Sequence, residues 1–409
     1  MTSLKVQFIN QISELPAAEW NAIAGLDYPF MRHEFLDALE KSESVSPEAG
    51  WTPLHLTAYN DDDELVAIAP CYGKTHSYGE YVFDWSWANA YYQNGLDYYP
   101  KLLTAIPFTP CIGPRILTRA DYDTPETYQL CVRAMLALCQ QSNLSSWHLL
   151  LPQSSLTDYL DEMVGDPGLS GLFKLGNREP SAQVGLMKRV GSQFHWYNRG
   201  YDTFADYMGS MTSRKRKNVR REREKVDAQG ITFVHLTGEE INDDQLDDFF
   251  VFYHATYMKR GQYGYLNRQF FDLLVESMPE NLLFIFAQKE VAPDDIINIA
   301  VAMFFKGADT IYGRYWGCLD EYDQLHFETC YYQGIDYCIA NNLYHFDSGA
   351  QGEHKIQRGF EPIETYSYHW VAHPQFRDAI ANFVENEQDH VREYIEEAQE
   401  FLPFKKGEA

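Results

Sequence analysis

Long apolar runs and paired cysteines are both missing from this chain of 409 residues. No uncharged apolar run reaches the length of about 18 residues that a membrane span needs. The N-terminal stretch MTSLKVQFINQISEL also has no basic segment followed by an apolar core, as a signal peptide would. We therefore expect no integral membrane span and a cytoplasmic location.

The cysteine and histidine patterns argue against a metal site. The seven cysteines are scattered, with no CxxC pair and an odd total, which excludes an evident disulfide scaffold or thiolate zinc site. His326 and Glu328 lie two residues apart, and there is no HExxH frame. The sequence therefore predicts no bound metal.

Basic residues are scarce and unevenly placed. There are 33 Lys and Arg against 59 Asp and Glu, a formal net charge of -26. Eight of the 33 lie between Ser210 and Val226, with three acids up to Asp227, so the rest of the chain carries 25 basic and 56 acidic residues. That remainder repels nucleic acid, phosphates and anionic lipid. A phosphate-bearing partner is therefore expected at the basic segment.

The basic segment, SMTSRKRKNVRREREKV, has a helical pattern. Five apolar residues fall within roughly a third of the circumference at 100° per residue: Phe204, Met208, Met211, Val219 and Val226. The pattern predicts one helix docked by this stripe, with Lys217 and Arg220 on the opposite side as substrate-binding candidates. The alternative is a solvated face neutralised by the chain's carboxylates.

Composition and segment order predict an α/β fold. An apolar content of 45% and an aromatic content of 15% exclude a largely disordered chain. In the second half a strand and two or more helices precede three antiparallel strands, a helix and further strands, which is typical of a mixed sheet. The first half has a similar order. We expect an N-terminal domain over residues 1–185, a C-terminal domain over 186–373 with the basic helix, and a helical tail over 374–409.

Polar residues are densest after the strand-like segment Ile311 to Trp316. The segment FDSGAQGEHKIQRGF then has a strand ending in Asp and a loop whose glycines allow a ligand to approach the backbone. A plain surface loop is the alternative. The candidates from this half are Tyr315, His326, Glu328, Tyr331, Asp347, Gln351, Glu353, His354, Lys355 and Arg358.

An aromatic-rich polar stretch in the first half, Glu80 to Arg115, is a second candidate for substrate contacts. It could line a groove, or its rings could belong to the core. Its candidates are Asp84, Trp85, Trp87 and Asn94.

These segments resemble a known family. The stretch TIYGRYWGCLDEYDQLHFETCYYQGIDYCIANNLYHFDSGAQGEHKIQRGFEPIETYSYHWV is similar to the second domain of Fem-type peptidoglycan aminoacyltransferases, and the basic helix is similar to theirs. The resemblance covers nearly the whole chain, including VFDWSWANAYYQNGLDYYPKLL, and is strongest to FemAB-like predicted N-acyltransferases. It implies tandem GNAT-like domains.

The resemblance implies transfer of an acyl or aminoacyl group to an amine, with a peptidoglycan precursor as an expected acceptor. It implies no permanently bound cofactor, and aminoacyl-tRNA or acyl-CoA as the donor. A GNAT domain that binds acetyl-CoA carries an R/QxxGxG/A loop, whereas this chain has WGCLDEYDQ with Gly317 alone. That departure weighs against acetyl-CoA, and the overall acidity weighs against transfer RNA.

Acyl transfer needs a group that takes the amine's proton and a donor that polarises the carbonyl. The candidates for proton transfer are Glu328 or Glu353 with His326 or His354, and the candidate donors are Tyr315 or Tyr331. Lys217, Arg220, Lys355 and Arg358 would hold an anionic carrier or precursor. The alternatives are a recognition module without chemistry, an acyl-CoA-dependent N-acetyltransferase, and a nucleic-acid-binding protein.

Overall fold

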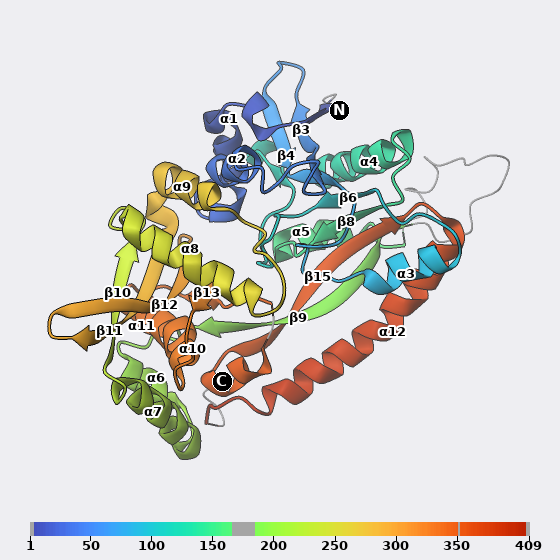
Figure 1. Cartoon of the computed structure of the whole chain (residues 1–409). Coiled ribbons are helices and arrows are strands. Elements are labelled where there is room, and N and C mark those ends of the chain that lie inside the picture. The colour runs from blue at the N-terminus through green and yellow to red at the C-terminus, as the bar shows by residue number, and fades with distance from the viewer. Residues whose placement is uncertain (1–3, 166–184, 351, 406–409) are drawn as a thin grey trace. The chain divides into compact units, whose positions relative to one another are not determined.

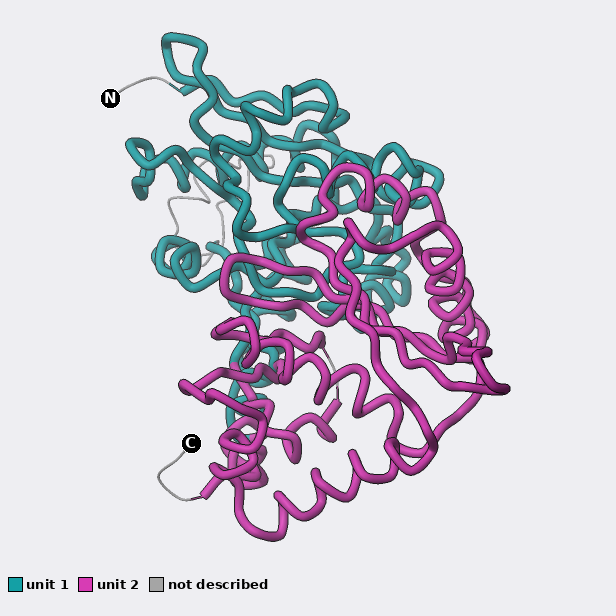
Figure 2. The backbone as a smooth tube through the Cα atoms, turned by 90° about the vertical axis from the view of Figure 1, so that its left-hand side faces the viewer, with its two compact units in different colours: residues 1–192, 364–393 teal, residues 193–363, 394–409 magenta. Residues whose placement is uncertain are grey.

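The computed structural model describes residues 4–165, 185–350 and 352–405, and Figure 1 shows its elements. The chain divides into two compact units, coloured separately in Figure 2. Unit 1 comprises residues 1–192 and 364–393, and unit 2 comprises residues 193–363 and 394–409. The domain boundaries expected at 185/186 and 373/374 stay a prediction.

Unit 1 contains two sets of paired strands. The first has the order β1-β3-β4-β7 and the second runs β2-β5-β6-β8-β15. The strands are β1 (Lys5–Ile9), β2 (Trp51–Pro53), β3 (His55–Tyr59), β4 (Leu65–Ala69), β5 (Cys71–Lys74), β6 (Lys101–Thr104), β7 (Leu117–Thr118), β8 (Ser146–Leu150) and β15 (Glu361–Val371). β6 and β8 are parallel, whereas β8 and β15 are antiparallel.

The helices of unit 1 cover these strands with apolar stripes. They are α1 (Ala17–Ala24), α2 (His33–Lys41), α3 (Trp85–Gln93), α4 (Pro125–Gln141), α5 (Ser154–Asp161) and the first part of α12 (Pro374–Gln399). α4 begins after Thr124, whose side chain accepts a hydrogen bond from the Thr127 amide. Its buried residues, which include Cys131 and Met135, pack with Trp147 of β8 in one core.

Unit 2 is built on strands in the order β10-β11-β12-β13-β14-β9. They are β9 (Met187–Tyr197), β10 (Ile231–Thr237), β11 (Leu282–Ala292), β12 (Asp295–Lys306), β13 (Thr310–Cys318) and β14 (His345–Asp347). β13 and β14 are parallel, and the other pairs are antiparallel. Each unit thus combines a parallel pair with antiparallel strands, which confirms the predicted mixed sheet.

Helices lie on both faces of the unit 2 strands (Figure 1). The Phe249 ring of α8 packs against Phe284 of β11, while the neighbouring Leu283 belongs to the core formed with α7 and α11 on the other face. The helices are α6 (Phe204–Ser210), α7 (Ser213–Asp227), α8 (Asp243–Met258), α9 (Arg268–Ser277), α10 (Leu325–Phe327), the π-helix Glu328–Tyr332 and α11 (Gln333–Ala340). The order of strands and helices follows the prediction closely.

The basic segment is not one helix, as the apolar stripe predicted. α6 ends at Ser210, α7 begins at Ser213, and Met211 between them is extended and fully buried. The reason is a backbone pairing: Lys405 N donates to Ser210 O (2.9 Å) and Thr212 N donates to Pro403 O (2.8 Å). The Ser210 carbonyl and the Thr212 amide are therefore not available for the hydrogen bonds of a continuous helix.

The close approach of α8 to β13 requires glycine at position 317. A Cβ atom added to Gly317 would lie 2.0 Å from the backbone oxygen of Phe252, whereas one added to Gly313 on the same strand would lie 3.3 Å from a Phe346 ring atom. A side-chain ring can turn away from an added methyl group, whereas the backbone of α8 can move only if the whole helix shifts. The glycine of the WG pair therefore has a packing role.

We expect Gly317→Ala to lower the free energy of unfolding by about 3 kcal/mol, because α8 must move away from the strand. Gly313→Ala on the same strand is the matched control and should cost less than about 1 kcal/mol. Urea denaturation followed by circular dichroism measures both. Equal losses would contradict the argument from backbone contact.

Candidate functional site in unit 2

The candidate site lies where β13 and β14 part. The two strands pair over three positions, Thr310↔His345 to Tyr312↔Asp347, after which β13 continues to Cys318 paired with β12 but no longer with β14. The segments that follow the two strands carry the polar residues of the cluster. In α/β sheets, ligands bind at the carboxyl ends of strands where neighbouring connections diverge.

A π-helix turns two neighbouring tyrosines toward different partners. Over Glu328–Tyr332 the backbone widens, and Gln333 N donates to Glu328 O. The Tyr331 hydroxyl then lies 2.9 Å from Nε2 of His354, while the Tyr332 hydroxyl donates to Glu222 of α7. Single π-turns in α-helices occur frequently at functional sites.

His326 is a neutral imidazole among aromatic rings. Its ring centroid lies 5.3 Å from that of Trp316 and 5.4 Å from that of Tyr331. Burial, aided by the charges of His354 and nearby cations, lowers the pKa of His326 to about 4. Within the described residues its nitrogens make no hydrogen bond. The ring is therefore neutral at pH 7 and keeps an unprotonated nitrogen, and the same lowered pKa makes it a weaker base than a free histidine.

His354 and Tyr331 extend this polar cluster. The His354 ring lies 6.0 Å from that of His326, and burial, with Arg358 and Lys355, lowers the pKa of His354. Burial raises the pKa of Tyr331, so its hydroxyl stays protonated. The structure thus brings three predicted residues together as a proton donor and two acceptors.

A pocket of about 400 Å³ adjoins this cluster, and His326 forms part of its wall. α8 contributes Thr256, and the turn after it contributes Lys259 and Arg260. The other lining residues come from β13, the segment after it and the start of α10: Trp316, Cys318, Glu321, Tyr322 and Leu325. Its lining combines cations and aromatic rings, which suits an anionic ligand with a planar or apolar part.

Sequence reasoning missed the cations and the aromatic wall of this pocket. Lys259 and Arg260 are adjacent cations at the end of α8 in an acidic chain, which is a signal that could have been used. Trp316 stood inside the predicted strand. Only the packing of α8 against β13 shows that these residues line one space.

The loop after β14 is shaped by its own charged residues. The buried Lys355 ammonium donates to Ser348 O and Gly349 O, both at 2.9 Å, and the Gly349 amide donates to Asp347 Oδ1 at 2.8 Å. Arg358 donates to His354 O at 2.7 Å. Gln351 lies outside the described residues.

Arg358 connects this loop to α7. It donates to Glu222 at 2.9 Å and its guanidinium lies 3.5 Å from the centroid of the Phe327 ring. Both contacts hold the turn that carries His354 against the helical segment.

The two predicted carboxylate bases lie apart from the pocket wall. Glu328 is buried in an ion pair with Arg223 (2.9 Å) and accepts from Gln333 (2.8 Å); burial raises its pKa even beside Arg223. Glu353 is exposed and accepts from the Tyr394 hydroxyl at 3.1 Å.

The other predicted residues of this half also lie elsewhere. Tyr315 packs edge-on against the Tyr253 ring. Lys217 and Arg220 are exposed on α7.

Unit 1 contains a buried network around Lys101. Its ammonium donates to Asp84 (2.5 Å), Glu80 (2.7 Å) and Ser77 (2.8 Å), and none of the four side chains is more than slightly exposed. Burial would raise the pKa of Asp84, but the Lys101 charge brings it well below its usual range. Tyr98 also donates to Asp84, at 2.6 Å.

Two Ser-x-His segments on neighbouring strands continue the network. His148 of β8 and His369 of β15 are directly opposed, and their Nδ1 atoms lie 2.7 Å apart. Burial, together with the Lys101 charge, lowers the pKa of His148 to about 3. Sequence reasoning did not use this repeated SWH and SYH signal.

The four candidates of the first half do not form one surface. Asp84 and Trp87 are buried, and the Trp87 ring contacts His369 at 4.9 Å between centroids. Trp85 is 41% exposed, and Asn94 is exposed at the end of α3, where it donates to Ala90 O.

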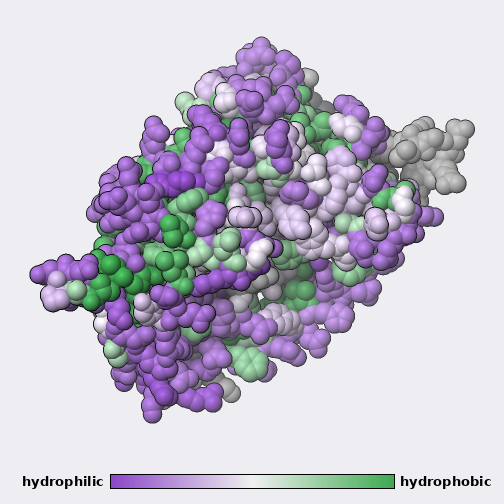
Figure 3. All heavy atoms as spheres, viewed as in Figure 1, coloured by the Kyte–Doolittle hydropathy of each residue, from purple (hydrophilic) through white to green (hydrophobic). Residues whose placement is uncertain are grey.

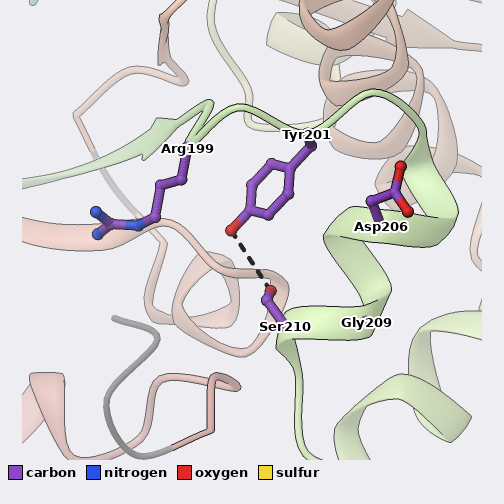
Figure 4. A pocket seen from close by; sticks show the side chains of 5 residues that line it. All are labelled: Arg199, Tyr201, Asp206, Gly209 and Ser210. Carbon is purple, nitrogen blue, oxygen red and sulfur yellow. Dashed lines mark hydrogen bonds between the residues drawn. The ribbon is translucent and has the colours of Figure 1, made fainter.

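A further pocket of about 390 Å³ in unit 2 is shown in Figure 4. In that view the Tyr201 hydroxyl and Ser210 are directed toward each other, at 3.5 Å. Arg199 pairs with Glu361, and Asp206 accepts from the Thr203 amide at the start of α6. Because Arg199 and Asp206 already pair with other residues of the chain, the pocket that His326 lines is the better candidate for a ligand site.

Within the described residues, no helix is both long and apolar enough to cross a membrane, and no three His, Cys, Asp or Glu side chains gather as metal ligands.

Comparison with known proteins identifies the class. Residues 11–406 match the FemAB-like family, described as peptidoglycan biosynthesis/recognition, and this chain belongs to that family. No curated protein sequence matches it. The predicted family is therefore confirmed.

Solved structures support the fold. FemX shares 10% identity with a TM-score of 0.51, over 92% of this chain and 100% of FemX. The C-terminal domain (DUF2156) described as that of a lysylphosphatidylglycerol synthetase from Agrobacterium fabrum shares 8% identity with a TM-score of 0.51, over 91% and 95%. A tandem GNAT protein from the clavulanic acid biosynthesis pathway reaches 0.43 at 9% identity, over 91% and 99%.

The predicted mixed α/β sheet is thus confirmed, and the fold is similar to that of FemX. Family membership supports the prediction of an acyltransferase in a peptidoglycan context.

Removal of the Lys101 charge should destabilise the protein strongly, because Glu80 and Asp84 would stay buried without a counter-ion. We expect Lys101→Met to cost about 3 kcal/mol or more of unfolding free energy. The control Lys41→Met removes an exposed lysine paired with Asp37 and should cost less than about 1 kcal/mol. Thermal and urea denaturation compare them, and similar losses would refute the role of the buried charges.

Neutral buried histidines should make the fold sensitive to acid. The pKa of His326 is about 4 in the folded protein, against 6.5 for a free side chain, so only the unfolded chain takes up the proton between these values. The stability that this group contributes is complete above pH 6.5 and is lost as the pH falls toward 4. His148 and His195, lowered to about 3 and about 4, act in the same direction.

His326→Gln should therefore reduce the loss of unfolding free energy between pH 7.5 and pH 5 by about 2 kcal/mol. Urea denaturation at both pH values measures this loss. His390→Gln, on the exposed side of α12, is the control and should leave the loss unchanged. An unchanged loss in His326→Gln would show that His326 is not buried in its neutral form.

Proposed function

We propose that this protein transfers an acyl or aminoacyl group to the amine of a peptidoglycan precursor. Membership of the FemAB-like family and a fold shared with FemX support this proposal. The observation that carries it is the position of a neutral His326 on the wall of a pocket with two cations.

The reaction needs a neutral amine nitrogen that attacks the carbonyl carbon of an activated ester or thioester. As the C–N bond forms, the nitrogen loses a proton, and we assign its uptake to the His326 imidazole. The C–O or C–S bond of the donor then breaks and its leaving group takes a proton. Tyr331, paired with His354 at 2.9 Å, is our candidate for the hydroxyl that polarises the carbonyl or protonates the leaving group.

Lys259 and Arg260 would hold the phosphate-bearing part of the donor in the adjoining pocket. Aminoacyl-tRNA and acyl-CoA both carry such phosphates, and neither requires a permanently bound cofactor. We propose the cytoplasm as the place of the reaction because both donors are made there. The roles predicted for Lys217, Arg220, Lys355, Arg358, Asp347 and Gln351, and for Asp84, Trp85, Trp87 and Asn94, in holding substrate stay proposals.

Glu328 and Glu353 are the alternative bases, with Tyr315 as the alternative donor. Glu328 would first have to leave its ion pair with Arg223, and Tyr315 its contacts with aromatic rings. The contacts therefore favour His326 and Tyr331. Recognition of a precursor without turnover is the second function, since the family description includes recognition.

Transfer can be tested with purified protein, a muramyl pentapeptide as acceptor, and alanyl-tRNA or acetyl-CoA as donor. Mass spectrometry would detect the new amide. We expect His326→Gln to reduce kcat at least a hundredfold and Tyr331→Phe about tenfold, because each removes a proton-transfer group.

His390→Gln and Glu353→Gln are the controls and should retain the rate. Loss of transfer in Glu353→Gln with a normal rate in His326→Gln would reverse the assignment of the base. Tight binding of the pentapeptide without any amide product would favour recognition alone.

A further inference from the structure

The outward face of α7 has four cations that pair with no residue in the described part of the chain. Arg214, Lys217, Arg220 and Arg221 are exposed, and none makes an ion pair or hydrogen bond to a described residue. At 100° per residue they span about 120° of the helix, opposite the buried Val219 and Val226. We call these four residues the α7 cationic face.

Two other cations of the same helix, Arg223 and Lys225, are paired with carboxylates. Arg223 contacts Glu328 and Asp336, and Lys225 contacts Asp323 at 2.7 Å. The chain has 59 acidic residues, so carboxylates that could pair with the four cations of the α7 cationic face are plentiful. The charge of the α7 cationic face is therefore directed at solvent, and the surface there is hydrophilic in Figure 3.

The helix start makes this charge costly without a partner. α7 has no acid in its first turn and no side-chain cap, so Arg214 stands at the positive end of the helix dipole. Like charges on adjacent turns add further repulsion. An anionic partner would relieve both effects.

An exposed aromatic residue lies near the same end of α7. Phe401 is 64% exposed. The chain after it pairs with the residues before α7, through Thr212 N to Pro403 O (2.8 Å) and Lys405 N to Ser210 O (2.9 Å). Two backbone hydrogen bonds thus join the segment that follows Phe401 to the residues that precede the cationic helix.

We propose that the α7 cationic face and Phe401 dock unit 2 onto an anionic lipid bilayer. Stable attachment to a bilayer generally needs two signals, and basic residues at about 1 kcal/mol each combine with an inserted apolar group. No residue of α7 is aromatic, so the helix itself has no platform on which nucleic acid bases could stack. This docking does not depend on acyl transfer.

Co-sedimentation of the full chain with vesicles tests the proposal. We expect binding to phosphatidylcholine vesicles that contain about a third phosphatidylglycerol, little binding to pure phosphatidylcholine, and release by salt. The double variant Arg214→Glu with Arg221→Glu should lower the binding at least tenfold. Lys5→Glu with Arg133→Glu changes the net charge equally on exposed residues of unit 1 and should bind as the unaltered chain does.

The apolar contribution has its own control. Phe401→Ser should weaken vesicle binding severalfold, whereas Ile296→Ser should not. Ile296 is 60% exposed on the β11–β12 hairpin, whose hydrophobic residues are green in Figure 3. Circular dichroism of each variant confirms that it is folded.

Three results would overturn the proposal: no binding to anionic vesicles, equal binding by both double variants, or no effect of Phe401→Ser. Binding of a fluorescent RNA oligonucleotide to the same variants tests the alternative, in which the α7 cationic face binds nucleic acid. RNA binding that the α7 variant abolishes, without vesicle binding, would assign the face to nucleic acid instead. None of these results depends on the transfer assay, because Arg214, Arg221 and Phe401 have no assigned role in it.

Discussion

The ion pair between Arg223 of α7 and Glu328 holds the candidate site in place. Glu328 opens the π-helix, and Arg223 also contacts Asp336 of α11, so one guanidinium fastens α7 to two turns of the helix that follows β13. The pair is costly to break from the side of Arg223, because the buried Glu328 carboxylate would lose its counter-ion. The direction of Tyr331 therefore depends on a contact that is distant in sequence.

Burial supplies the chemistry that residue types alone could not. A histidine at pH 7 is a useful proton acceptor only if it is neutral, and desolvation ensures this for His326. The same effect keeps His148 neutral beside Lys101 in unit 1. In unit 1 the cost of burying Lys101 and His148 is offset by hydrogen-bond partners, which include His369 on the neighbouring strand, so this network is also structural.

Prediction from the sequence succeeded where local patterns dominate and failed where long-range contacts decide. The helix Pro125–Gln141, for example, begins after a Thr cap and has an apolar stripe, and both are local signals that the sequence carries. The basic segment breaks at Met211 because residues 403–405 pair with it, and no local pattern records that. His326, Tyr331 and His354 were candidates by residue type, but the sequence does not show the contacts that distinguish them from Glu328 or Glu353.

By itself, the sequence determined the α/β class, the family and the single concentration of positive charge in an acidic chain. These follow from periodicity, motif order and composition, which need no knowledge of distant contacts. Only the tertiary structure decided which cations of the basic segment are paired and which are free, and which of several polar residues line a pocket. Burial and pairing depend on segments about a hundred residues apart, as Arg223 and Glu328 are.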